Sequence, residues 1–396
     1  MISERIQNLS PSATLAMSQK SAELKAAGID VINMSVGEPD FHTPRFIKEA
    51  AKKAIDDNFS TYSPVPGYLS LRKAICEKLL RDNHLEYTPE QIVVGNGAKQ
   101  ELCNTILALV NPGDEVIIPT PAWVSYVEMV KLAEGKSVLV PAGLDTDFKV
   151  TAAQIRDAIT DKTKLLLLNS PCNPTGSVYN KEELEDIAAV LRDYPDIMVM
   201  SDEIYEHINF VDEVYSIARC PGMKERTVII NGVSKAYAMT GWRAGFMAAP
   251  LPVAKACTKL QGQYTSGASS ISQKAAEAAY LGPQDCVEEM RQAFERRRDL
   301  IVELASQIPG WKVNKPQGAF YLFPDVSYYI GSSCGKYSIN SSADYVMFLL
   351  AEAHVACVDG DAFCAPGYMR LSYATSDDNI KEAIRRIKDA SLKLKK

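Results

Sequence analysis

The sequence has few of the residues from which metal sites and disulfide frameworks are built. Its 396 residues include four histidines and nine cysteines, and the cysteines are scattered without a CxxC pair. Structural zinc sites need cysteine and histidine ligands at short spacing, so we expect no metal site. An odd number of cysteines without a framework favours reduced thiols, and this predicts a cytoplasmic location.

Long apolar runs and an excess of one charge are also lacking. No run approaches the ~20 apolar residues that a membrane span requires. The first five residues, MISER, lack the apolar core of a signal peptide. The 43 basic and 49 acidic residues are spread along the chain and give a net charge of −6. We therefore expect neither a membrane nor a nucleic acid as a partner.

Helical periodicities alternate with short apolar runs between residues 44 and 280. Helices are predicted at residues 47–55, 69–80, 100–109 and 184–191 and from residue 124, and strands at residues 115–118, 164–168, 197–200, 227–230 and 245–248. These strands lack polar alternation, so both of their faces must be buried. The pattern predicts an α/β fold with a mainly parallel sheet between layers of helices.

The C-terminal part of the chain has a different pattern. It predicts helices at residues 286–307 and 343–353 and from residue 378, a half-buried strand at 318–323, and strands near residues 355 and 369. This mixture is typical of a smaller α+β domain, and the chain is long enough for two domains. We expect residues 1–40 to form an N-terminal arm and part of the small domain, residues 41–285 the large domain, and residues 286–396 the small C-terminal domain.

The segment of residues 231–245 places a lysine among small residues. Lys235 follows an apolar strand in a turn where no bulky neighbour blocks a ligand. Ser234 adds a hydroxyl, and Arg243 follows eight residues later with a fork of donors suited to phosphate. Lysine becomes a good nucleophile only when burial or a neighbouring cation activates it. A solvated surface pair is the alternative, but the small residues favour a reactive amine beside an anion site.

Two further segments carry polar residues just past predicted strands, and a third leads into a predicted helix. Asp202 follows a buried strand, where a carboxylate is costly unless it is paired. Asn173 lies between two prolines that hold the turn extended. Ala98 follows two glycines and begins a predicted helix, whose N–H groups favour an anion. Taken alone, these segments would be an N-cap, a turn and a weak glycine-rich loop.

Two segments point to a carboxylate ligand. Gly37 allows a ligand to approach the backbone closely. Arg370 lies on a predicted strand of the small domain, where a half-buried guanidinium needs an anion. A structural ion pair is the alternative for Arg370.

Seven motifs, from residues 11–14 to 371–375 and in the same order, resemble those of class I pyridoxal-phosphate-dependent aminotransferases of fold type I. Residues 97–100, 123–129 and 201–207 most resemble the bacterial Ib subgroup of aspartate aminotransferases. The resemblance implies a large domain with a seven-stranded-type sheet. It also implies transfer of an amino group from an amino acid, aspartate first, to a 2-oxo acid such as 2-oxoglutarate.

The resemblance also implies a role for each matching residue. Lys235 carries pyridoxal 5′-phosphate and moves the proton, and Asp202 keeps the cofactor's ring nitrogen protonated. The remaining cofactor-binding positions are Tyr205, Asn173, Ser234, Arg243, Ala98 and Trp123, together with Tyr62, which reaches the phosphate from a neighbouring subunit of a homodimer. The substrate-binding positions are Gly37, Trp123, Asn173, Arg370 and Lys99, and Arg370 holds the α-carboxylate while Lys99 holds the distal one. Two glutamates of the same motif as Asp202, Glu203 and Glu206, are expected to be structural.

Three departures from the family pattern bear on the substrate and the phosphate. Gly232 lies where many relatives have a hydroxyl residue that binds phosphate, and Ser234 is expected to substitute for it. Ser10 replaces a lysine and Asp361 a threonine in segments that shape the distal-carboxylate side. An inward-facing Asp361 would repel a second carboxylate. An aminotransferase for an aromatic or neutral amino acid therefore stays open, as does, more remotely, a pyridoxal-phosphate-dependent lyase.

Overall fold

The computed structural model describes residues 2–396 and contains a seven-stranded sheet with strand order β2-β8-β7-β6-β5-β3-β4. Every neighbouring pair is parallel except those that β8 forms with β2 and β7. The strands are β2 (Ile92–Gly95), β3 (Glu115–Thr120), β4 (Lys136–Pro141), β5 (Thr163–Asn169), β6 (Met198–Asp202), β7 (Thr227–Gly232) and β8 (Gly245–Ala248). The predicted mainly parallel sheet is confirmed, with β2 and β4 added at its edges.

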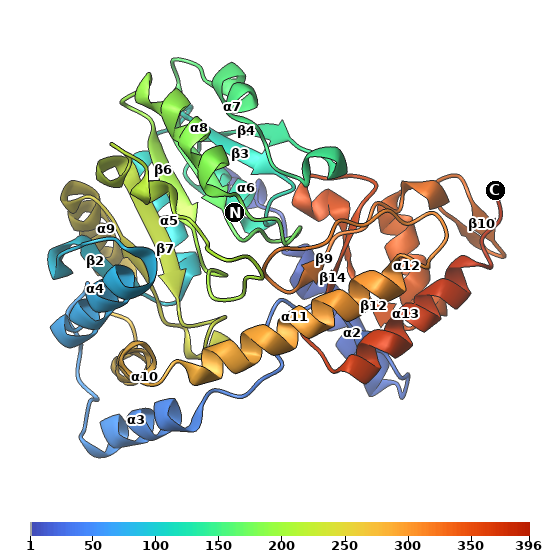
Figure 1. The fold of residues 1–396 in the computed structure, drawn as a ribbon, viewed down its shortest axis with the longest axis horizontal. Coiled ribbons are helices and arrows are strands. Elements are labelled where there is room, and N and C mark those ends of the chain that lie inside the picture. The colour runs from blue at the N-terminus through green and yellow to red at the C-terminus, as the bar shows by residue number, and fades with distance from the viewer. Residues whose placement is uncertain (1) are drawn as a thin grey trace.

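Helices cover both faces of this sheet, as Figure 1 shows. One face carries α5 (Ala98–Leu109), α6 (Ser125–Leu132) and α9 (Leu251–Tyr264), and the other carries α4 (Leu69–Asn83), α7 (Ala152–Ala158), α8 (Lys181–Arg192) and α10 (Ser270–Leu281). Helix α3 (Arg45–Asp56) packs against α10, farther from the sheet (Figure 1). Along β5, Leu165 and Leu167 pack into one layer and Leu166 and Leu168 into the other. Burial on both faces accounts for the uninterrupted run of leucines.

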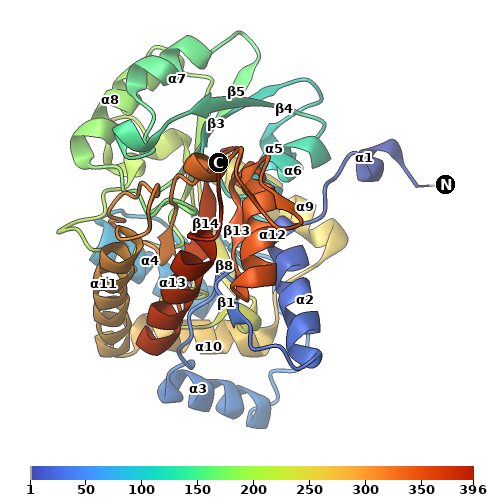
Figure 2. The same ribbon diagram turned by 90° about the vertical axis from the view of Figure 1, so that its right-hand side faces the viewer.

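A second group of elements has its own core and joins the sheet through a long helix (Figures 1 and 2). The helices are α2 (Ala13–Ala26), α11 (Asp285–Ala305), α12 (Ser342–Glu352) and α13 (Asp377–Ser391), and the strands are β1 (Ile32–Asn33), β9 (Tyr321–Leu322), β10 (Ser333–Cys334), β11 (Tyr337–Ser338), β12 (Val355–Ala356), β13 (Val358–Asp359) and β14 (Met369–Ser372). Its core contains Met17, Ile32 and Met34 beside residues 290–390. The parallel pairing of β1 with β12 brings the start of the chain into this group.

The strand predicted at residues 318–323 is wrong in its first half. Only Tyr321–Leu322 is regular, and Ala319 has a φ of 56°. The N–H of Gly318 donates to the carbonyl of Gly176, and that of Ala319 to the carbonyl of Ile208. The backbone of residues 318 and 319 is therefore held by the loops that follow β5 and β6 rather than by a neighbouring strand.

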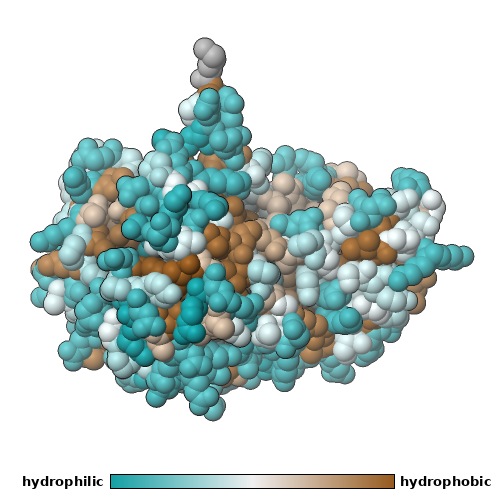
Figure 3. Space-filling view, turned by 90° about the horizontal axis from the view of Figure 1, so that it is seen from above, coloured by the Kyte–Doolittle hydropathy of each residue, from teal (hydrophilic) through white to brown (hydrophobic). Residues whose placement is uncertain are grey.

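The chain begins with a short helix, α1 (Glu4–Gln7), on a segment that projects from the rest of the molecule (Figures 2 and 3). The side chains of Ile2 and Ile6 on this segment are exposed. None of the helices formed by residues 2–396 is long and apolar enough to cross a membrane. In the same range, no group of three His, Cys, Asp or Glu side chains is placed to hold a metal ion.

Candidate active site

A cavity of about 390 Å³ lies between the sheet and the second group of elements. Eleven of the twelve predicted site residues line it, namely Gly37, Ala98, Lys99, Trp123, Asn173, Asp202, Tyr205, Ser234, Lys235, Arg243 and Arg370. They come from turns at the carboxyl ends of the strands, from the start of α5 and from β14. Carboxyl ends of parallel strands meet at one edge of a sheet, which is why residues so distant in sequence share one cavity.

Lys235 presents a largely buried amine to this cavity. Its Nζ donates a hydrogen bond to the carbonyl oxygen of Gly37 at 2.5 Å. Burial, helped by the nearby cations Arg370 and Arg243, lowers the pKa of Lys235 to about 8 against the opposing effect of Glu38. A substantial fraction of the amine is therefore neutral near physiological pH and can act as a nucleophile or a base.

Asp202 ends β6 and places a buried carboxylate in the same cavity. The hydroxyl of Tyr126 donates to its Oδ2 at 2.7 Å, and the N–H of Ile204 donates to its Oδ1 at 3.2 Å. Burial raises the pKa of Asp202 to about 6, although both hydrogen bonds and the charge of Lys235 oppose the rise. The carboxylate thus lacks a full counter-charge and favours a cationic ligand.

The start of α5 and Arg243 form a site for an anion. Arg243 adopts a left-handed conformation with a φ of 55°, and its guanidinium donates to the carbonyls of Thr240 and Asn96 at 2.9 and 3.1 Å. A Cβ on Gly97 would lie 2.5 Å from Nη2 of Arg243, so only glycine permits this approach. The free N–H groups of the helix and the accessible guanidinium suit a phosphate.

Arg370 is fully buried on β14 without a carboxylate partner among residues 2–396. It donates to Oδ1 of Asn173 at 2.9 Å and to the carbonyl of Ser35 at 2.6 Å, while its Nε has no partner. The ring of Tyr321 lies 4.4 Å from the guanidinium carbon. Burial lowers the pKa of Arg370, so this cation is poised for an anion that enters the cavity.

Aromatic side chains make up much of the remaining wall. The hydroxyls of Tyr205 and Tyr321 are hydrogen-bonded at 2.7 Å. Trp123 meets Tyr126 edge to face at 5.3 Å between ring centroids, and Nζ of Lys99 lies 4.7 Å above the Trp123 ring. Partial burial and the nearby Arg243 lower the pKa of Lys99.

The sequence prediction missed several lining residues, among them Tyr126, Asn169 and Tyr321. Tyr126 lies one helical turn after Trp123, a spacing that could have suggested it. Asn169 ends β5, and its side chain donates to the carbonyl of Asp202 at 2.9 Å and accepts from the N–H of Asn173 at 2.8 Å. Tyr321 gives no local signal, because its contact with Tyr205 joins segments 116 residues apart.

Tyr62 is the predicted residue that does not line the cavity of this chain. Its side chain is 98% exposed. Three positions, Asp361, Ser10 and Gly232, depart from the family pattern. Asp361 and Ser10 are exposed and do not line the cavity, and the N–H of Ser10 donates to Glu128. A Cβ on Gly232 would lie 2.8 Å from Cα of Gly245, so the close approach of β7 and β8 requires glycine there.

The chain is similar to known proteins over almost its whole length. Residues 29–387 match the family model described as aminotransferase class I and II. The chain is 49% identical over 389 residues to an aspartate aminotransferase of Bacillus sp. (strain YM-2), with 98% of each chain covered. It is 46% identical over 390 residues to an aspartate/prephenate aminotransferase of Nitrosomonas europaea, again with 98% of each covered.

Two solved structures of aspartate aminotransferases also resemble this chain closely. The aspartate aminotransferase from Rhizobium meliloti superposes with a TM-score of 0.96 at 42% identity and covers 100% of both chains. The aspartate aminotransferase from Thermus thermophilus with maleate gives a TM-score of 0.93 at 41% identity, with 98% of this chain and 99% of that chain covered.

The buried carboxyl of Asp202 predicts a pH effect on stability in the absence of a ligand. Between about pH 4 and pH 6 the folded protein keeps a proton at Asp202 that the unfolded chain has released, so stability falls as pH rises through this window. Asp202→Asn should remove roughly 3 kcal/mol of this loss. Tyr126→Phe should extend the window upward, since it removes a bond that lowers the pKa. Chemical unfolding at a series of pH values measures both effects, and identical pH profiles for the three proteins would contradict the assignment.

Proposed function

The chain belongs to the class I and II aminotransferases, and we propose that it moves the α-amino group of aspartate to 2-oxoglutarate. One observation carries the reaction type: a depressed-pKa lysine, a buried aspartate and a buried arginine without a counter-ion share one cavity. The choice of aspartate is supported by the names of the relatives and by Lys99, a second cation in the same cavity.

The residues of the cavity fit pyridoxal 5′-phosphate, the cofactor of this family. Arg243, Ser234 and the N-terminus of α5 would hold its phosphate, and Asp202 would pair with its ring nitrogen. The glycine required at Gly97 keeps the anion site open. When bound, the cofactor supplies an aldehyde that takes up an amine and a protonated ring that withdraws electrons from Cα.

Lys235 is the proton carrier of the proposed reaction. Its amine would take the proton from Cα of the amino acid and deliver it to C4′ of the bound cofactor, acting first as base and then as acid. The depressed pKa makes both steps accessible near neutral pH. The hydrogen bond to the carbonyl of Gly37 holds Nζ within the cavity.

Asp202 and Tyr205 set the charge around the reacting centre. Asp202 would keep a proton at the ring nitrogen of the bound cofactor, and Tyr126 orients the carboxylate by donating to Oδ2. Tyr205 supplies a hydroxyl to the same cavity, and its bond to Tyr321 fixes the direction of that hydroxyl. Charge held in place before the reaction needs no reorganisation when electrons move.

Arg370 and Asn173 bind the α-carboxylate, and Lys99 binds the distal one. Arg370 gives up its hydrogen bond to Asn173 or shares it, and its unpartnered Nε becomes a donor to the substrate. Because Asp361 is exposed and lies outside the cavity wall, it does not oppose a second carboxylate in this chain.

The proposed enzyme is a cytosolic homodimer with two domains in each chain. The domains are residues 41–285 and residues 286–396 with residues 1–40. The exposed Tyr62 and the projecting segment that carries Ile2 and Ile6 support a second copy as partner (Figure 3). Scattered cysteines without a disulfide framework support a reducing compartment.

Lys235→Ala should abolish amino transfer. The loss should be at least about 10³-fold in kcat, since both the covalent anchor and the proton carrier are removed. A coupled assay of oxaloacetate formation from aspartate and 2-oxoglutarate measures it, with Lys255→Ala on α9 as a matched surface control. Turnover near that of the unaltered protein in Lys235→Ala would refute the function.

Lys99→Met should lower kcat/KM for aspartate by about 10- to 100-fold, because a charge-assisted contact to the distal carboxylate is lost. Phenylalanine has no distal carboxylate, so its kcat/KM should change by less than about 2-fold. Steady-state kinetics with both donors measures the ratio. An equal fall for both donors would place Lys99 elsewhere than at the distal carboxylate.

Mixtures of two inactive variants should test the position of Tyr62. Tyr62→Ala removes the residue that a partner lends, and Lys235→Ala removes the amine of its own site. Reassociated mixed dimers would carry one site with both residues intact, so activity should rise well above the sum of the separate variants. Activity equal to that sum would place Tyr62 outside the site of the partner.

A further inference from the structure

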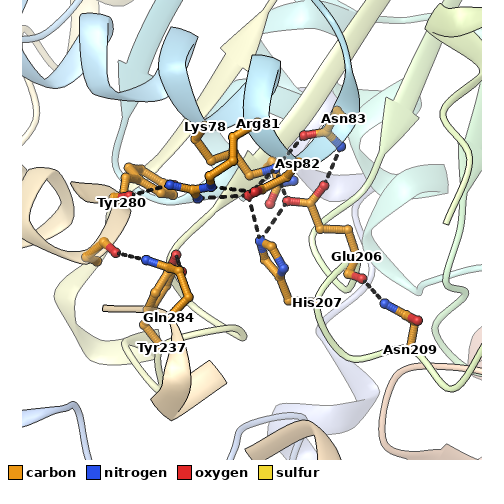
Figure 4. Close-up of polar contacts among 12 residues, drawn as sticks. Lys78, Arg81, Asp82, Asn83, Glu206, His207, Asn209, Tyr237, Tyr280 and Gln284 are labelled. Carbon is orange, nitrogen blue, oxygen red and sulfur yellow. Dashed lines mark hydrogen bonds and ion pairs between the residues drawn. The ribbon is translucent and has the colours of Figure 1, made fainter. Parts of the chain in front are cut away.

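A polar cluster with a buried centre lies beside the Asp202–His207 turn and is made of residues that do not line the cavity (Figure 4). It joins the last turns of α4 to this turn and consists of Lys78, Arg81, Asp82, Asn83, Glu206 and His207. We call it the rear cluster. None of its members lines the cavity.

Lys78 occupies a position of α4 where an apolar residue would be expected. Its side chain is 1% exposed, and it lies on the same helix face as Leu71, Ile75 and Leu79, which belong to the core of the sheet. An amphipathic helix normally places aliphatic side chains along this stripe. A lysine buried there is costly unless it is fully paired.

Lys78 is paired with one carboxylate oxygen and one amide oxygen. Its Nζ donates to Oε1 of Glu206 and, at 2.7 Å, to Oδ1 of Asn83. Nδ2 of Asn83 in turn donates to Oε2 of Glu206 at 2.7 Å, so both carboxylate oxygens are held by α4. Burial would raise the pKa of Glu206, but Lys78, with His207 and Asn83, lowers it to about 2, and the carboxylate stays charged.

The turn that Glu206 belongs to has two opposite faces. Asp202 and Tyr205 line the cavity, whereas Glu203 and Glu206 point away from it. Beyond Asp202 the turn is neither helix nor strand. Its own backbone is held by hydrogen bonds from the N–H of Glu203 to the carbonyl of Ile230 and from the N–H of Glu206 to the carbonyl of Glu203. Glu206 follows Tyr205 directly, so the grip of α4 on Glu206 acts on the residue next to a cavity-lining tyrosine.

Stability alone does not account for the Lys78–Glu206 pair. Replacing a buried ion pair by apolar residues of similar size is often neutral or stabilising, since desolvation offsets the attraction. What an ion pair adds is a fixed geometry, because two carboxylate oxygens held by two donors cannot slide as aliphatic side chains can.

We propose that Lys78 and Glu206 are positioning residues, which hold the Asp202–His207 turn against α4 so that Tyr205 and Asp202 keep their places in the cavity. Asn83 completes the contact by fixing the second carboxylate oxygen. This inference rests on the proposed function, since it takes Asp202 and Tyr205 to face the cofactor.

Lys78→Met and Glu206→Gln test the proposal in the cofactor-loaded enzyme. If the turn shifts, kcat should fall by about 10-fold while KM changes by less than about 2-fold, because positioning affects the reacting centre more than substrate binding. The pH midpoint of the cofactor's visible absorption band should also move by about 0.5 or more, since Tyr205 and Asp202 set the charge around the ring. Absorption spectra across pH measure this shift without turnover.

Lys274→Met is the matched control. Lys274 is a half-buried lysine of α10 paired with Glu277 at 3.0 Å, and it does not contact the turn. The Lys274→Met variant should leave the pH midpoint of the absorption band and kcat unchanged. If the unaltered enzyme and this control show no visible band with pyridoxal 5′-phosphate, the proposed function fails. If they do and both test variants keep the same midpoint and kcat, the positioning role alone fails.

The double variant Lys78→Met/Glu206→Met separates positioning from stability. It leaves no unpaired charge, so its midpoint of thermal unfolding should recover toward that of the unaltered protein. The displaced band midpoint and lowered kcat should nevertheless remain, because the fixed geometry is still missing. Recovery of all three properties together would show that the pair serves only stability and would overturn the proposal.

Discussion

Arg370 is held in the interior by a carbonyl, an amide oxygen and an aromatic ring, none of which balances its charge. A fixed carboxylate beside it would be more stable but would exclude an acidic ligand. Lys235 and Asp202 share this incomplete pairing, and each has a pKa displaced toward its neutral form. Desolvated groups of this kind favour ligands that supply the missing charge. The fold therefore keeps three incompletely paired charges in one cavity. The free energy that their desolvation costs must be offset by packing in the rest of the structure.

The sheet makes such an arrangement possible. Strands buried on both faces form a rigid layer, and their carboxyl ends bring Asn169 and Asp202 to one edge. The second group of elements then adds Arg370 and Tyr321 from across the cavity. Because substrate contacts come from both sides, the bound carboxylate would tie the two parts together and exclude water.

The Asp202–His207 turn shows how polar groups behind a site can matter as much as those within it. One face presents Asp202 and Tyr205 to the cavity, and the other is bound through Glu203 to Ser201 and Ser216 and through Glu206 to α4. The expectation that the two glutamates are structural agrees with these contacts. A residue whose own contacts are structural can therefore affect the site, because the backbone joins it directly to a residue that lines the cavity.

The sequence by itself determined the layered α/β fold, the positions along the chain of five of the sheet's strands and eleven residues of one cavity, since apolar runs and ordered motifs are local properties of the chain. It did not reveal the edge strands β2 and β4, the broken strand before Tyr321, or the roles of Tyr126 and Tyr321. Only the tertiary structure decided these, and with them the pairing of Lys78 with Glu206, because the side-chain contacts concerned join residues 76 to 128 positions apart and depend on burial. Local patterns record which side chains need partners, whereas packing determines which partners they find.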